Sequence, residues 1–91
     1  MNEEILISNG WDPKPAMIGT LYFKGRFFCN LKDDEAFVYS VYDDMYCIGI
    51  AKSIEDMFEI EKKYDLDQIR LVELNLKYLK KEYKEKYGET L

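Results

Sequence analysis

The sequence contains no histidine, and this absence excludes several kinds of active site at once. Ser-His-Asp and Cys-His nucleophiles both need an imidazole base, and histidine is also the commonest metal ligand. The two cysteines, Cys29 and Cys47, cannot form a four-thiolate zinc site by themselves. Both lie in apolar, strand-like runs, so we expect buried, reduced thiols, with a disulfide left open if their strands are adjacent.

Long apolar runs and glycine-rich phosphate loops are also absent. No stretch approaches the ~20 residues that span a bilayer, and the acidic N-terminus lacks the pattern of a signal peptide. We therefore expect a cytoplasmic protein with no membrane segment. Neither GxxxxGK[ST] nor GxGxxG occurs. The Asp65-Leu66-Asp67 sequence fails as a calcium loop, because Ile69 and Arg70 stand where a ligand and a glycine are required. We expect no metal, no cofactor and no enzymatic activity.

What the sequence does have is a large aromatic content for its size. Its 91 residues suit a single domain, 1–91, and include eight tyrosines and five phenylalanines. Each ring brings roughly 150–250 Å² of surface to be covered. This surplus predicts that some rings lie at the surface or at an interface, and a homodimer is one way to cover them.

The order of local patterns predicts an α+β fold with about five strands in a mostly antiparallel sheet and two helices packed on one face. The sheet would comprise two hairpins plus an N-terminal and a late strand. A helix follows Ser53, which has the spacing of a capping box with Asp56. The predicted elements, in order, are a strand at 5–8, a stiff proline loop at 11–15, a hairpin at 18–31 turning at Lys24-Gly25, a charged loop at 32–35, a hairpin of 37–42 and 45–51 turning at Asp43-Asp44, a helix to Tyr64, a strand at 69–74, and a helix from the Asn75 cap to Tyr87.

Side-chain alternation assigns the hairpin residues to two faces. In the first hairpin Tyr22 pairs with Phe27, and Phe23 lies with Arg26 on the other face. In the second hairpin the face that contains Phe37 and Ile50 is apolar throughout, whereas the opposite face is mixed.

Three pairs of aspartates are candidates for acid–base chemistry, but all three lie in predicted turns. They are Asp33-Asp34, Asp43-Asp44 and Asp65/Asp67. Aspartate is common in turns because it bonds local backbone amides and tolerates solvent. We therefore expect solvated turns, with no cleft that would shift one carboxyl pKa relative to the other.

The charge is unevenly distributed. Residues 1–74 carry 8 basic and 15 acidic side chains (8 − 15 = −7), and residues 75–91 carry 5 basic and 3 acidic ones (5 − 3 = +2), giving the net charge of −5. An acidic body repels phosphates, so direct nucleic-acid binding is disfavoured. Acidic side chains on a small rigid sheet can instead occupy the basic cleft of a nucleic-acid-handling protein. Small phage-encoded inhibitors, including anti-CRISPR proteins, are similar in size and acidity, without any shared motif.

These observations predict a non-enzymatic protein-binding domain, with an inhibitor or regulator of a nucleic-acid-handling protein as its specific form. The candidate partner-binding residues are Trp11, Phe23, Arg26, Asp33, Asp34, Tyr42, Asp43 and Asp44. Trp11 has an alternative role, in which its ring folds back to cap one end of the core. Two other functions stay open: a nucleic-acid binder that uses Lys77, Lys80, Lys81 and Lys84, and a small-ligand domain with a pocket at a dimer seam.

Overall fold

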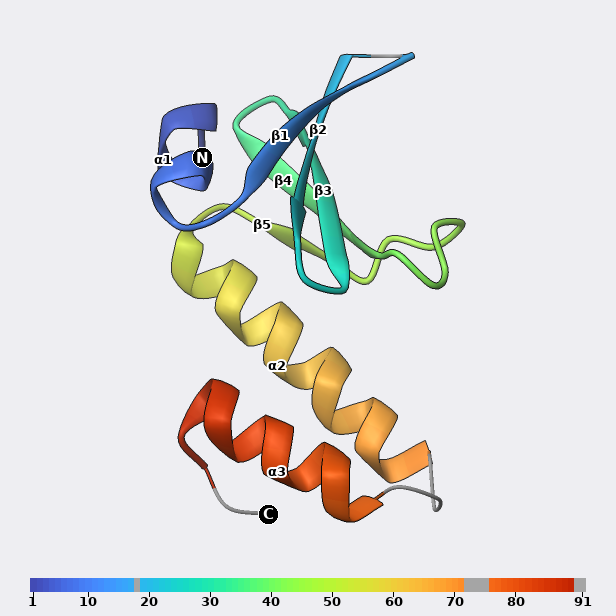
Figure 1. Cartoon of the computed structure of the whole chain (residues 1–91). Coiled ribbons are helices and arrows are strands. Elements are labelled where there is room, and N and C mark those ends of the chain that lie inside the picture. The colour runs from blue at the N-terminus through green and yellow to red at the C-terminus, as the bar shows by residue number, and fades with distance from the viewer. Residues whose placement is uncertain (18, 72–75, 90–91) are drawn as a thin grey trace. The chain divides into compact units, whose positions relative to one another are not determined.

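The computed structural model describes residues 1–17, 19–71 and 76–89 and confirms an α+β fold with a five-stranded antiparallel sheet (Figure 1). The strands follow one another in the order β1-β2-β3-β4-β5, each paired with the next along the chain. The chain forms two compact units, Met1–Ile60 and Glu61–Leu91. The elements are α1 (Glu3–Ser8), β1 (Asp12–Ala16), β2 (Gly19–Lys24), β3 (Phe27–Lys32), β4 (Glu35–Ser40), β5 (Gly49–Ala51), α2 (Ile54–Leu71) and α3 (Leu76–Tyr87).

The first element is a short helix, so the strand predicted at 5–8 is wrong. Asn2 caps it, because its side-chain oxygen accepts a hydrogen bond from the Ile5 backbone N–H at 2.9 Å. Glu3 and Glu4 fill the first turn, where carboxylates interact favourably with the positive end of the helix. Only Leu6 of this helix is buried. The cap and the two acidic residues therefore favour a helix over the strand that the apolar run suggested.

The proline segment is the edge strand β1, although it was predicted to be a loop. Pro13 lies opposite Tyr22, and Pro15 lies opposite Thr20. The two prolines are two residues apart, so the positions of their missing N–H groups point to the same side of the strand. An edge strand tolerates proline when that side faces away from its neighbour. The outer edge of the sheet thus lacks two backbone donors, which hinders pairing with another chain.

The turn of the β2–β3 hairpin lies one residue later than predicted. Lys24 pairs with Phe27, and the turn is made by Gly25 and Arg26, with Gly25 at φ 57°. Every pairing therefore moves by two residues, and Tyr22 lies opposite Cys29. A shift of two keeps each side chain on its predicted face.

The charged segment 32–35 contains the β3–β4 turn. Asp33 and Asp34 have φ values of 53° and 63°, the left-handed conformation that a tight two-residue hairpin turn requires. Beyond it, Phe37 pairs with Ile50, in keeping with the register predicted around Asp43-Asp44. The regular strands end earlier than predicted, however, and residues 41–48 form a loop.

The buried face of the sheet carries fewer large apolar side chains than the opposite face does. Its fully buried positions include Phe27, Cys29, Val38 and Ser40. Gly49 shares this face, and a Cβ added there would lie 2.7 Å from Ile60 side-chain atoms. The first turns of α2 therefore pack directly on this face, and most of the large aromatics lie on the other face.

The helix α2 begins where predicted but runs further. The Ser53 Oγ accepts from the Asp56 N–H at 3.1 Å, and Asp56 accepts from the Lys52 N–H at 3.0 Å. The helix then continues through Asp65 to Leu71, so 69–71 are helical, whereas 72–74 of the predicted strand lie outside the described residues.

The helix α3 matches its predicted span. Gly88 ends it with φ 72° and donates its N–H to the Lys84 carbonyl at 2.8 Å. The predicted Asn75 cap lies outside the described residues.

Candidate partner-binding surface

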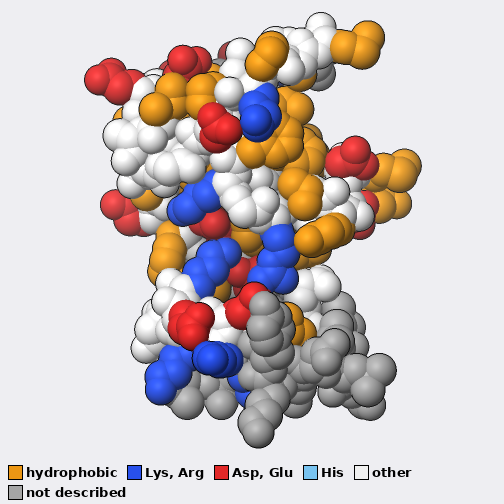
Figure 2. All heavy atoms as spheres, in the orientation of Figure 1, with side chains coloured by type: hydrophobic (Ala, Val, Ile, Leu, Met, Phe, Trp, Pro, Cys, Tyr) orange, Lys and Arg blue, Asp and Glu red, His pale blue; other side chains and the backbone are white. Residues whose placement is uncertain are grey.

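The loop 41–48 carries the most exposed cluster of large apolar side chains that the structure describes. Tyr42, Met45 and Tyr46 are 76%, 81% and 68% exposed, and Asp43 and Asp44 between them are also exposed. At the right-hand edge of Figure 2, where Figure 1 places this loop, hydrophobic and acidic side chains stand side by side. Groups of exposed apolar side chains are typical of interaction sites, whereas single ones are ordinary.

The loop is anchored at both of its ends. The Val41 N–H donates to the Arg26 carbonyl at 2.8 Å, and the Ile48 N–H donates to the Val38 carbonyl at 2.8 Å. The Ser40 Oγ accepts from the Tyr42 N–H at 3.2 Å, and Ser40 also forms a bridge with Asp43. Ser40 is fully buried, so the sheet itself holds the start of the loop.

The structure gathers some of the predicted site residues and separates others. Arg26 lies in the β2–β3 turn and shares an end of the sheet with Tyr42, Asp43 and Asp44. The Asp33-Asp34 turn lies at the other end, because β3 and β4 run the full strand length between the two turns. The two acidic pairs therefore do not form one acidic surface.

Phe23 belongs to a row of rings across three strands. Phe28 stacks between Phe23 and Tyr39, with ring centroids 5.5 Å and 5.1 Å apart. All three are half-buried and lie on the face opposite Cys29 and Val38. Phe23 thus belongs to this row of rings within the sheet and not to the loop 41–48.

Trp11 is only 2% exposed, and Lys24 Nζ lies 5.8 Å from its ring centroid. The structure thus shows the alternative role, in which the ring packs into the core. A partner could reach this ring only after a local rearrangement.

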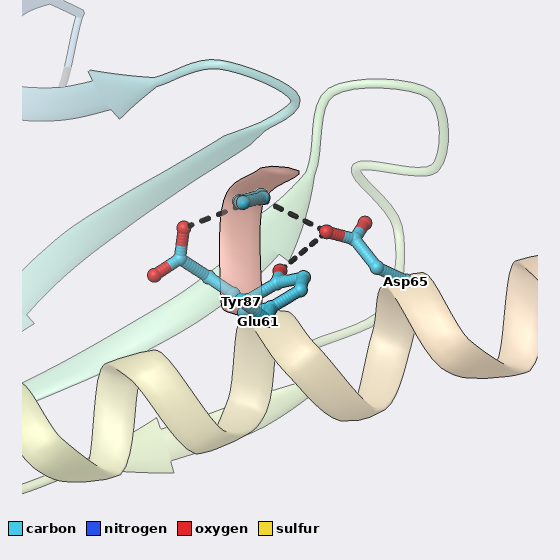
Figure 3. A network of polar contacts seen from close by, with 4 residues as sticks. Glu61, Asp65 and Tyr87 are labelled. Carbon is cyan, nitrogen blue, oxygen red and sulfur yellow. Dashed lines mark hydrogen bonds and ion pairs between the residues drawn. The ribbon is translucent and has the colours of Figure 1, made fainter. Parts of the chain in front are cut away.

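The unit 61–91 contains two buried carboxylates that the sequence did not suggest. Glu61 is 2% exposed and Asp65 is 5% exposed, and they lie one helical turn apart on α2 (Figure 3). Lys86 Nζ of α3 lies 2.9 Å from Asp65 Oδ2 and 3.8 Å from Glu61 Oε1. The Tyr87 hydroxyl donates to the same Asp65 oxygen. The expectation of a solvated turn at Asp65 and Asp67 is therefore wrong, because both residues lie in α2 and Asp65 is buried, although Asp67 is exposed.

This polar cluster perturbs Tyr87. Burial, the hydrogen bond to Asp65, and the charges of Asp65 and Glu61 all raise the pKa of the Tyr87 phenol above its ordinary value. The phenol therefore stays neutral and serves as a hydrogen-bond donor. The cluster joins α2 to α3 through Lys86 and Tyr87, so we assign it a structural role.

A sequence signal for this cluster did exist. Met57, Glu61, Asp65 and Ile69 recur every fourth residue, and all four are buried. Charged residues usually lie at the surface, so this spacing does not by itself show that the two carboxylates are buried. Phe58, next to Met57, is 43% exposed.

The cysteines differ from each other. Neither cysteine forms a disulfide. Cys29 is buried as expected, whereas Cys47 is exposed in the loop 41–48, so the expectation for Cys47 is wrong. Within the part of the chain that the structure describes, no group of three or more Cys, Asp or Glu side chains is placed to hold a metal ion. A shallow hollow of about 290 Å³ is lined by residues 19–22, 30 and 31.

The lysines proposed for nucleic-acid binding are exposed where they are described. Lys80, Lys81 and Lys84 lie at the surface of α3, and the Lys77 side chain lies outside the described residues. Lys86, in contrast, is engaged by the buried carboxylates.

Comparisons with protein-family models, with curated proteins and with solved structures found no match. None of the helices in the described ranges has the length and apolar character needed to cross a membrane. The functional argument therefore rests on the surfaces of this chain.

Proposed function

We propose that this protein is a non-enzymatic protein-binding domain that engages its partner through the loop 41–48. The observation that carries the proposal is the joint exposure of Tyr42, Met45 and Tyr46 beside two aspartates on one anchored loop. Tyrosine is enriched at the energetic centres of interfaces, because its ring buries a large area at low entropic cost.

The charge of the loop defines the partner's chemistry. Asp43 and Asp44 are exposed, and the chain as a whole carries −5. Such a loop is attracted to a surface that has an apolar cavity rimmed by lysine or arginine. Nucleic-acid-handling proteins have basic clefts of this kind, and a domain lodged in such a cleft would act as an inhibitor or regulator. The anchored ends of the loop reduce the entropy lost on binding.

The test compares two pairs of substitutions that remove the same charge. Asp43→Asn/Asp44→Asn changes the loop, and Asp33→Asn/Asp34→Asn changes the opposite end of the sheet. Asparagine tolerates the left-handed backbone of the second pair, so that control keeps its turn. The tagged protein is incubated with nuclease-treated cell lysate, and retained proteins are eluted with a salt gradient and identified by mass spectrometry.

We expect the unmodified protein and the 33/34 variant to retain the same lysine- and arginine-rich protein, and the 43/44 variant to lose most of it. Met45→Ser, at a side chain with almost no packing to lose, should weaken retention as well. Equal retention by both double variants would refute the assignment of the loop. Retention that is seen only in a parallel lysate without nuclease treatment would instead favour a nucleic-acid bridge held by the lysines of α3.

A further inference from the structure

The face of the sheet opposite the core carries most of its large apolar side chains. This open face comprises Leu21, Phe23, Phe28, Phe37, Tyr39 and Ile50, which the strand register places side by side. Ile50 is 51% exposed, and the others are half-buried.

Both helical elements of the unit 1–60 contact the other face. The Tyr22 hydroxyl, which lies on the core side with Cys29, donates to Glu3 of α1 at 2.6 Å. Ile60 of α2 packs against Gly49, which is also on the core side. Within this unit, α1 and the start of α2 therefore leave the open face uncovered.

The geometry of the rings decides what can bind there. The planes of Phe28 and Tyr39 differ by 15°, and those of Phe28 and Phe23 by 29°, with centroids about one strand spacing apart. Rings stacked in this way across neighbouring strands stand upright on the sheet. Their faces cover one another and their edges point outward. A nucleobase needs a free ring face to stack on, so this row suits contact with other side chains instead.

The charges around the face are balanced. Lys14 and Asp12 lie 3.4 Å apart at the β1 edge, and Lys32 lies opposite Glu35 across β3 and β4. The strand register places all four on the open face. A strongly basic or acidic partner would meet as many like charges as opposite ones. A second copy of the same face carries equal numbers of positive and negative side chains. A two-fold axis allows each lysine of one copy to face a carboxylate of the other.

We propose that this open face is a self-association surface and that the protein forms a two-fold dimer through it. The proposal is independent of the function assigned to the loop 41–48. Neighbouring strands lie about 4.8 Å apart, and each residue extends a strand by about 3.3 Å. A patch of five strands, each five residues long, therefore has an area of about 400 Å² per copy. The two copies together bury about 800 Å², less than the roughly 1,000 Å² expected of a stable interface, so the dimer is a weak one and dissociates with a constant between about 1 μM and about 1 mM.

Sedimentation equilibrium from about 2 μM to about 2 mM tests the proposal. The mass should rise from the monomer value of 10.9 kDa toward twice that value. Ile50→Lys places a charge on the open face, and Ile7→Lys on α1 is its matched control, because Ile7 is an isoleucine of similar exposure at 45%. We expect Ile50→Lys to raise the dissociation constant at least about tenfold and Ile7→Lys to leave it within about twofold.

Ile50→Glu serves as a second variant of opposite charge with the same expected result, and thermal unfolding verifies that each variant folds. A 10.9 kDa particle at every concentration overturns the dimer. A dimer that both Ile50 variants leave intact, or that Ile7→Lys weakens equally, overturns the assignment of the face.

Discussion

Replacing Lys86 by methionine tests whether the buried carboxylates of α2 depend on this cation. The methionine keeps the length and apolar stem of the side chain but removes an ammonium that lies 2.9 Å from Asp65 Oδ2 and 3.8 Å from Glu61 Oε1. Both carboxylates are almost completely buried. In the variant they would face each other one helical turn apart with less compensation.

The magnitude follows from the burial of each partner. Breaking a fully buried ion pair by removing one member costs about 3–5 kcal/mol, because the remaining charge is left uncompensated. The Lys86 side chain is 39% exposed, so water screens it and the cost is lower. A charged hydrogen bond contributes about 1.5–3 kcal/mol, which sets the expected loss near 2 kcal/mol. For a domain of this size that loss corresponds to a fall of about 8–16 °C in Tm.

Lys84→Met is the matched control. Lys84 is exposed and lies in the same last turn of α3, so both variants lose the same favourable interaction with the helix end. Thermal unfolding followed by far-ultraviolet circular dichroism compares them. Adding Asp65→Asn to Lys86→Met should recover much of the loss, because a neutral amide needs no cation. Equal Tm values for the Lys86 and Lys84 variants would refute the reasoning.

Two further predictions concern the unit 1–60. Gly49→Ala should lower the free energy of unfolding by about 1–3 kcal/mol, because the added methyl group meets Ile60 at 2.7 Å, and Ile60→Val should relieve part of this loss in urea unfolding. Burial, and then the hydrogen bond and charge of Glu3, raise the pKa of Tyr22 from 10.0 to about 12. Because the folded state holds the proton more tightly, this stabilisation is complete below pH 10 and is lost as the pH rises through about 12. Tyr22→Phe should therefore flatten the alkaline loss of stability between these values, and an unchanged slope would contradict the assignment.

Much of the fold could be predicted because its signals are local. The Ser53 cap and Asp56 lie within one turn. Ser53 Oγ accepts from the Asp56 N–H as expected, whereas the Asp56 carboxylate accepts from the Lys52 N–H and not from that of Ser53. Gly88 ends α3 as predicted. Alternation placed the side chains of the hairpins on the correct faces even where the turn moved by one residue.

The wrong elements have identifiable physical causes. The segment 5–8 was assigned to a strand from its apolar residues, although Asn2 three residues before Ile5 was a capping signal of the helix. The prolines of β1 suggested a loop, because nothing local showed that their strand would lie at an edge. The turn at Asp33-Asp34 was predicted, but only as part of a charged loop at 32–35, because aspartate signals the left-handed backbone of a tight hairpin turn less strongly than Asn-Gly does.

The candidate site was predictable only in part. The sequence placed Tyr42, Asp43 and Asp44 at a turn, and the structure adds Met45 and Tyr46 by ending the strand at Ser40. Trp11 had two possible positions that the sequence could not separate, because its burial depends on the packing around it. The Asp33-Asp34 pair shares the loop's chemistry but lies at the other end of the sheet.

By itself, the sequence determined the α+β class, the helix caps, the side-chain alternation and the exclusion of histidine-dependent chemistry. These properties depend on composition or on residues a few positions apart. Only the tertiary structure decided that Glu61 and Asp65 are buried, since Lys86 and Tyr87 lie more than twenty residues further along the chain. It also decided which face of the sheet α2 packs on. The start of α2 approaches the face that carries Gly49, because a glycine leaves room for Ile60, and not the face that carries most of the large apolar residues. Whether a side chain is buried depends on residues far away in the sequence, and a local pattern cannot specify which of them will pack against it.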